Sequence, residues 1–192
     1  MNCCIFGSAS DHIDKNYRDK TYELSLRLAK LGHTLIFGAG RHGVMGASAR
    51  GFFDGGGKIV GVVPKFFQED DIELPFLHCD ELILTETMRE RKGIMEERSD
   101  AFLILPGGIG TFEELFEVLT LKQLKRHNKP ILFYDIDGYY RPLLSMMEES
   151  IKQHFITPTC RELYQVFDNP DDLIDALYQT EPEYDVKELK EG

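Results

Sequence analysis

Tryptophan is absent from this 192-residue sequence, cysteine is scarce, and no apolar run is long enough to span a bilayer. The four cysteines form no CxxC pair, so we expect reduced, mostly buried thiols and not a disulfide framework. The six histidines form no HExxH motif and pair with no cysteine at a metal-binding spacing. These absences predict a protein with no metal, no cofactor and no membrane partner. The first seven residues do not resemble a signal peptide, and we expect a cytoplasmic protein.

Basic residues are also in short supply. Lysine and arginine total 22 against 33 aspartates and glutamates, which gives a net charge of −11. This balance argues against a nucleic-acid partner, because such proteins usually present a basic surface to the phosphate backbone. It does not exclude a small anionic ligand, which local arginines, lysines and helix N-termini can hold. The length predicts one domain over residues 1–180, followed by a charged, flexible tail at 181–192.

Short apolar runs alternate with longer amphipathic stretches along the chain. The runs predict buried strands at residues 3–6, 34–37, 59–63, 81–84, 102–105 and 131–134. The stretches predict helices at residues 15–31, 44–54, 88–98, 111–125, 139–153 and 170–178, with a short element near 164–167. Continuous apolar strands are typical of a sheet that helices cover on both faces. The sequence therefore predicts an α/β fold, a Rossmann-like doubly wound parallel sheet.

Three predicted strands are followed by loops rich in glycine or small residues, at 7–10, 38–46 and 106–111. Doubly wound sheets bind ligands at the carboxyl ends of their strands. Glycines there allow close approach of a ligand, and the next helix N-terminus favours an anion. Thr111 offers a hydroxyl donor and is also a candidate helix cap. Each loop alone is explained equally well by a tight strand-to-helix turn, but three in ligand-facing positions favour a binding site.

The nature of the anion is left open by these loops. Gly38, Gly40 and Gly43 have the dinucleotide-binding spacing, but they follow the second predicted strand and no convincing acid comes about twenty residues later. The absence of GxxxxGK[ST] excludes a P-loop NTPase.

Two charged clusters flank the third loop. Arg89, Arg91 and Lys92 form either a solvated helix face or one wall of the cleft. Glu113 and Glu114 complement a helix dipole, and since they point about a quarter-turn apart, only one of them can lean over a ligand. A carboxylate beside a phosphate loop suits cleavage of a glycosidic bond, whose transition state resembles an oxocarbenium ion.

The same residues resemble a known family. Residues 106–114 resemble the PGGxGTxxE signature of the LOG (Lonely Guy) family of cytokinin-activating phosphoribohydrolases. Residues 88–95 are similar to its M-x-x-R-K-x-x-M segment, and residues 38–46 to its GGGxxGLMG stretch, with Ala39 in place of one glycine. The resemblance runs from about residue 3 to residue 167.

This resemblance implies a homodimer that hydrolyses the N-glycosidic bond of AMP and N6-modified AMP, nucleoside 5′-monophosphates, releasing free base and ribose 5-phosphate. It places the catalytic pair on Arg91 and Glu114. The substrate-binding residues that it implies are Ser8, Glu73, Lys92, Gly107, Gly108, Ile109, Gly110, Thr111, Glu113 and Thr120. Ile109 replaces a tyrosine frequent in plant members, which affects the preferred N6 substituent and not the core chemistry.

Three alternatives remain at this point. A nucleotide-binding or sensor module could use the same loops without turnover. A lysine decarboxylase, a label such sequences have carried, usually needs pyridoxal phosphate on a lysine, and this chain is short for that machinery. A nucleoside phosphorylase or phosphoribosyltransferase would require phosphate or pyrophosphate as a second substrate.

Overall fold

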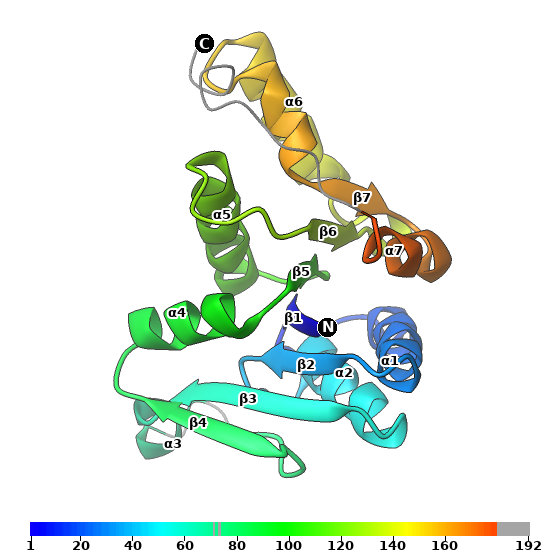
Figure 1. Ribbon diagram of the computed structural model, residues 1–192, viewed down its shortest axis with the longest axis vertical. Helices are drawn as coiled ribbons and strands as arrows, with labels where there is room; N and C mark the ends of the chain where they lie inside the picture. The colour runs from blue at the N-terminus through cyan, green and yellow to red at the C-terminus, as the bar shows by residue number, and fades with distance from the viewer. Residues whose placement is uncertain (71, 73, 180–192) are drawn as a thin grey trace.

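The computed structural model describes residues 1–70, 72 and 74–179, so Glu73 and the expected tail at 181–192 lie outside the described residues. Its centre is a seven-stranded sheet in the order β4-β3-β2-β1-β5-β6-β7, with every neighbouring pair parallel (Figure 1). The predicted doubly wound parallel sheet is confirmed. The strands are β1 (Asn2–Phe6), β2 (Thr34–Phe37), β3 (Lys58–Pro64), β4 (Glu81–Thr85), β5 (Ala101–Ile104), β6 (Ile131–Tyr134) and β7 (Gln165–Phe167).

Helices cover both faces of this sheet. One face packs against α1 (Lys15–Lys30), α2 (Gly43–Asp54) and α7 (Pro170–Ala176). The opposite face packs against α4 (Met88–Arg98), α5 (Ile109–Gln123) and α6 (Arg141–Lys152). Three short helices complete the described chain, α3 (Phe66–Glu69), η1 (Ile136–Gly138) and η2 (Pro158–Leu163). No helix among the described residues is both long and apolar enough to cross a membrane.

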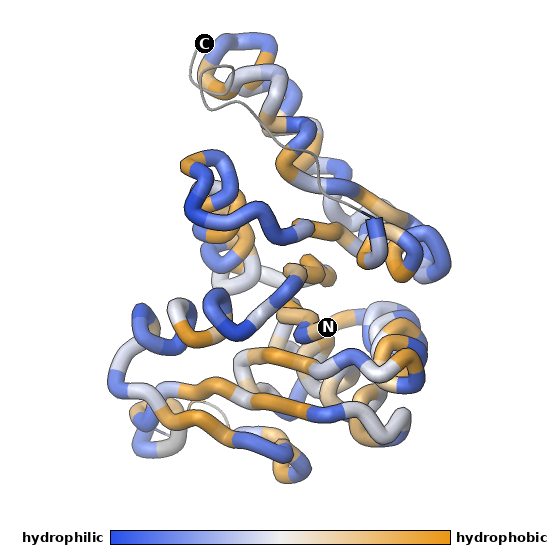
Figure 2. Tube along the Cα trace, viewed as in Figure 1, coloured by the Kyte–Doolittle hydropathy of each residue, from blue (hydrophilic) through white to orange (hydrophobic). Residues whose placement is uncertain are grey.

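The inner strands are apolar over most of their length because alternate side chains enter two different cores, whereas the edge strands β4 and β7 are partly exposed. On β1, Cys3 and Ile5 pack with the helices of one face, whereas Cys4 and Phe6 pack with those of the other. Figure 2 shows the result as hydrophobic segments along the central strands, with hydrophilic stretches on the outer turns. This two-sided burial is the physical reason for the continuous runs in the sequence.

The strand order reverses between β1 and β5, which are neighbours although four helices, α1 to α4, and three strands separate them in sequence. Parallel sheets of this kind bind ligands in the crevice at such a reversal. The loops that leave β1 and β5 meet there, since the Ser8 amide donates to the Pro106 carbonyl at 3.1 Å. The first and third glycine-rich loops are thus joined at the expected ligand position.

Several helix ends differ from the prediction. Helix α5 begins at Ile109 with Gly108 as its N-cap, so Thr111 lies inside the first turn and is not the cap. The helix starts early because Gly108 takes an extended conformation and the backbone turns directly from it. Helix α6 begins at Arg141 and not at residue 139, because η1 occupies the preceding residues. Helix α7 is capped by Asn169, whose side chain accepts from the Asp172 amide.

Candidate active site

A cavity of about 330 Å³ opens at the carboxyl ends of β1 and β5. It joins the first loop, the start of α5 and one side of α4. Its lining consists of Gly7, Ser8, Ala9, Met45, Phe67, Met88, Arg91, Gly108, Gly110, Thr111 and Glu114. The two predicted catalytic residues, Arg91 and Glu114, therefore lie in one cavity with the predicted phosphate loop. Of the three glutamates near the start of α5, only Glu114 lines it.

The start of α5 forms the polar wall of this cavity. A Cβ added to Gly108 or Gly110 would meet no atom within 4 Å, so both backbones face open space. Gly107 is different, because its Cβ would lie 2.1 Å from Thr111 Oγ1 and 3.0 Å from the Ser8 amide nitrogen. Gly107 therefore allows the two loops to pack closely, while the later glycines leave a helix N-terminus open to an anion.

Arg91 is held in place by the protein on three sides. Its side chain is only 6% exposed, and its Nε donates to the Val62 carbonyl of β3 at 3.1 Å. The guanidinium lies 5.9 Å from the centre of the Phe67 ring. It also fills the space beside Gly38, where a Cβ would lie 1.8 Å from Nη2. A buried guanidinium with these supports has one preferred position in the cavity wall.

Glu114 faces Arg91 from α5. Its Oε1 lies 3.7 Å from Arg91 Nη1, which is an ion pair but too long for a direct hydrogen bond. Burial raises the pKa of the Glu114 carboxyl to about 7, against the opposing attraction of Arg91. A carboxyl that titrates near neutral pH can accept a proton from water or donate one.

The second glycine-rich loop has a different role from the one its spacing suggested. Gly38 makes room for Arg91, and a Cβ on Gly46 would lie 2.0 Å from the Arg41 carbonyl oxygen. At Gly43 φ is +59°, and a Cβ there would lie 2.5 Å from the Ser8 carbonyl oxygen. These glycines allow close packing between segments of the protein, so this loop is a tight strand-to-helix turn. Of the segment 38–46, only Met45 lines the cavity.

Five of the described residues predicted to bind substrate lie outside the cavity lining. Gly107 packs against Thr111 and Ser8 beside the cavity. Lys92 and Glu113 form an ion pair with each other between α4 and α5. Ile109 projects from α5 and is 84% exposed. Thr120 lines a separate groove near α6. Glu73, the remaining predicted contact, lies outside the described residues.

The sequence reasoning missed the apolar wall of the cavity, which Met45, Phe67 and Met88 form. Phe67 comes from α3, a four-residue helix directly after β3 that has too few residues to show a periodic pattern. The available signal was its position, since a Phe-Phe pair follows the carboxyl end of a buried strand. One polar and one apolar wall suit a ligand with an anionic end and a planar or apolar end.

Within residues 1–70, 72 and 74–179, no group of three or more histidine, cysteine, aspartate and glutamate side chains is placed to hold a metal ion. The chemistry that the cavity can perform with its own residues is charge stabilisation and proton transfer by Glu114 and Arg91.

Comparisons with known proteins identify the family of this chain. The family described as "Possible lysine decarboxylase" matches residues 45–177. A probable cytokinin riboside 5′-monophosphate phosphoribohydrolase of Oryza sativa subsp. japonica, LOGL2, is 35% identical over 182 residues, covering 95% of this chain and 74% of the relative. The cytokinin riboside 5′-monophosphate phosphoribohydrolase LOG3 of Arabidopsis thaliana is 35% identical, covering 93% of this chain and 82% of the relative.

Solved structures share the fold at lower identity. The molybdenum cofactor carrier protein of Chlamydomonas reinhardtii superposes with a TM-score of 0.69 at 21% identity, covering 92% of this chain and 94% of that one. The molybdenum cofactor binding protein of Rippkaea orientalis gives a TM-score of 0.67 at 19% identity, with the same coverage of both chains. Likeness at this level shows the fold alone. The plant relatives, which match over nearly the whole chain, show more: this chain belongs to the LOG family of cytokinin riboside 5′-monophosphate phosphoribohydrolases.

Proposed function

We propose that this protein hydrolyses the N-glycosidic bond of AMP and N6-modified AMP, releasing the free base and ribose 5-phosphate. One observation carries the proposal. Arg91 and Glu114 face each other in a cavity whose adjoining wall is the open N-terminus of α5. The names of the plant relatives describe the same reaction on cytokinin nucleotides.

The 5′-phosphate binds at the first turn of α5, where Gly108 and Gly110 leave the backbone open. Ser8 and Thr111 line the same end of the cavity and add hydroxyl donors. The base then lies toward Met45, Met88 and Phe67, which offer apolar and aromatic surface. Binding energy at the phosphate orients the anomeric carbon beside Glu114.

The reaction breaks the bond between the anomeric carbon and the base nitrogen and forms a bond from that carbon to a water oxygen. The Glu114 carboxylate stabilises positive charge on the ribose and accepts a proton from the attacking water. The departing nitrogen takes up a proton from solvent as the base leaves, and Glu114 returns the proton that it accepted to solvent, so one water is consumed in total. Arg91 orients the carboxylate and holds either the ribose phosphate or the departing base.

Base release by purified protein tests this proposal. We expect AMP and isopentenyl-AMP to yield free base and ribose 5-phosphate in buffer that contains neither phosphate nor pyrophosphate. A dependence on phosphate or pyrophosphate would instead indicate a phosphorylase or a transferase. Tight binding of both nucleotides with no base released would favour the non-catalytic binding module.

The lysine decarboxylase description of the matching family fits the cavity less well. Decarboxylation with pyridoxal phosphate requires a lysine that can form a Schiff base with the cofactor. Among the described residues that line the cavity there is no lysine, and the neighbouring Lys92 is paired with Glu113. Incubation of the purified protein with lysine and pyridoxal phosphate should release no carbon dioxide.

We also propose that the protein assembles into a homodimer. A groove of about 270 Å³ lies between α5 and the segment after α6, and Phe116 and Phe155 at its edge are 42% and 81% exposed. Thr120, which the family resemblance assigns to the nucleotide site, lines this groove and not the chain's own cavity. A second copy docked on this face covers the exposed rings and gives Thr120 a route to a partner's site.

The thiols and the net charge support a proposal for the compartment and the partner of the protein. All four cysteines are free thiols, which supports the cytoplasm as its compartment. The net charge of −11 supports a small-molecule partner over a nucleic acid. The chemistry assigned to Arg91 and Glu114 needs neither a metal nor a cofactor.

A further inference from the structure

Helices α4 and α5 each carry two consecutive charged residues that point to different places. Arg91 on α4 and Glu114 on α5 line the cavity. Their sequence neighbours, Lys92 and Glu113, form an ion pair outside it. The two helices are thus joined by two neighbouring charge pairs, one inside the cavity and one behind it.

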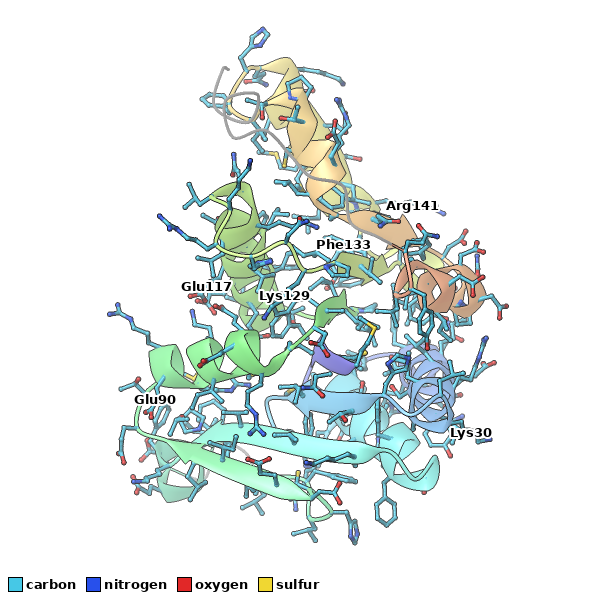
Figure 3. All side chains as sticks on the ribbon, viewed as in Figure 1. Lys30, Glu90, Glu117, Lys129, Phe133 and Arg141 are labelled. Carbon is cyan, nitrogen blue, oxygen red and sulfur yellow. The ribbon has the colours of Figure 1, made fainter. Side chains whose placement is uncertain are left out.

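The Lys92 ammonium is held by two carboxylates of α5. It forms ion pairs with Glu113 and Glu117, and its side chain is only 14% exposed. Glu117, labelled in Figure 3, lies where α5 faces α4. Burial alone would lower the pKa of Lys92, but the two carboxylates outweigh it and the pKa is raised. Lys92 is therefore a charged, fixed contact between the helices that carry the reacting pair.

We propose that Lys92 is a positioning residue of the active site, which fixes Arg91 relative to Glu114 by clamping α4 to α5 through Glu113 and Glu117. This inference rests on the function proposed above. It differs from the expectation that Lys92 contacts the nucleotide, because the ammonium is paired on α5 and is not part of the cavity lining.

The clamp also acts on the charge of Glu114. The groups that face Glu114 are Arg91 and Lys92 from α4, Glu113 and Glu117 from its own helix, and the Cys4 thiol from β1. After burial, Arg91 and Lys92 lower the pKa of the Glu114 carboxyl, whereas Glu113 and Glu117 raise it. Removing either member of the Lys92–Glu113 pair breaks the same contact but moves the Glu114 pKa in opposite directions.

Opposite shifts of the Glu114 pKa would not result from a simple loss of packing, so they provide a test. In Lys92→Met we expect kcat for AMP to fall roughly 10- to 100-fold, with KM changed by less than about threefold. The acid limb of its pH–rate profile should move to higher pH. In Glu113→Gln, where Lys92 keeps Glu117, the acid limb should move to lower pH. Lys92→Arg should retain kcat within about fivefold, since a guanidinium can also bridge two carboxylates.

The matched control is Arg89→Met, which removes one positive charge from an exposed position on the same helix. It should leave kcat, KM and the pH profile unchanged. A rise in KM of about tenfold or more in Lys92→Met, with kcat and the pH profile intact, would show that Lys92 binds substrate directly and would overturn the proposal. So would profiles that move in the same direction in Lys92→Met and Glu113→Gln.

A titration of Glu114 separates this inference from the proposed function. The carboxyl carbon of Glu114, observed by NMR in isotopically labelled protein without nucleotide, should titrate higher in Lys92→Met and lower in Glu113→Gln. Opposite shifts in a protein that releases no base would refute the proposed reaction and support the clamp. Unchanged titration in an active enzyme would refute the clamp alone.

Discussion

The Arg91 guanidinium occupies the space that any side chain at position 38 would need. A Cβ on Gly38 would lie 1.8 Å from Arg91 Nη2 and 3.0 Å from its Cζ. Arg91 is at the same time fixed by the Val62 carbonyl at 3.1 Å. A glycine in the second loop therefore determines where the cation of the cavity lies.

Gly38→Ala should impair catalysis more than stability. The added methyl group pushes the guanidinium away from Glu114, and a displacement of about 1 Å in a reacting group can cost about 100-fold in rate. We expect kcat/KM for AMP to fall roughly 10- to 100-fold, measured by release of adenine. The melting temperature should fall by only a few degrees, because the clash is with the end of a side chain.

Gly93→Ala is the control for that substitution. Gly93 lies on α4 two residues after Arg91, and a Cβ there would meet no atom within 4 Å. We expect unchanged turnover and a gain of up to about 1 kcal/mol in stability, because alanine favours helix. If Gly38→Ala retains full activity, catalysis does not depend on the observed position of the Arg91 guanidinium.

The pH dependence of turnover should report the Glu114 carboxyl. Since the carboxylate form accepts the proton of water, activity should rise with pH and level off above the Glu114 pKa of about 7. Glu114→Gln should lower kcat by roughly 100-fold or more and remove this limb. A limb that persists in a residually active Glu114→Gln protein would belong to another group.

The same substitution should stabilise the fold at high pH. Burial raises the Glu114 pKa from 4.5 to about 7, so the folded state favours the protonated carboxyl. Ionisation destabilises the fold increasingly between pH 4.5 and pH 7 and fully above it, by roughly 3 kcal/mol. Glu114→Gln should therefore exceed the native protein in urea unfolding at pH 8 and match it below pH 4.5. Equal stability at both pH values would contradict the burial argument.

The groove between α5 and the end of α6 predicts which substitutions change assembly. Phe155→Glu should shift the protein from dimer to monomer in sedimentation velocity, because it places a charge on the face proposed to meet a second copy. Leu77→Glu is the matched control, since Leu77 is 84% exposed and Phe155 81%, and Leu77 lies in the segment before β4. A dimer that persists in Phe155→Glu would place the interface elsewhere.

The inner strands were predictable because they are buried on both faces and form nearly unbroken apolar runs. The three-residue edge strand β7 is partly exposed and shows no such run. The three glycine-rich loops were located for the same reason, as they follow those runs, although only the first and third form the cavity wall with their backbones. Helix ends were less accurate, since α5 starts at Ile109 through the backbone freedom of Gly108 and not through a capping side chain.

The detailed site needed the structure, because its decisive contacts join residues far apart in sequence. Nothing in the chain near Gly38 indicates that Arg91 will lie against it. The pairing of Lys92 with Glu113, 21 positions later, leaves the ammonium outside the cavity lining, and neither residue alone reveals this. The resemblance to a family supplied Arg91 and Glu114, and their shared cavity supplied the physical reason.

Helix α5 also sets the spacing between the two parts of the cavity wall that it carries. Its open first turn and Glu114 belong to one element, and the Glu114 backbone lies four residues, about 6 Å along the helix axis, beyond Gly110. The distance between the open first turn and the Glu114 backbone is therefore set by helix geometry. Under the proposed reaction, a nucleotide phosphorylated at the 3′ position would present the wrong ribose atom to Glu114, and an unphosphorylated nucleoside would have no end to anchor.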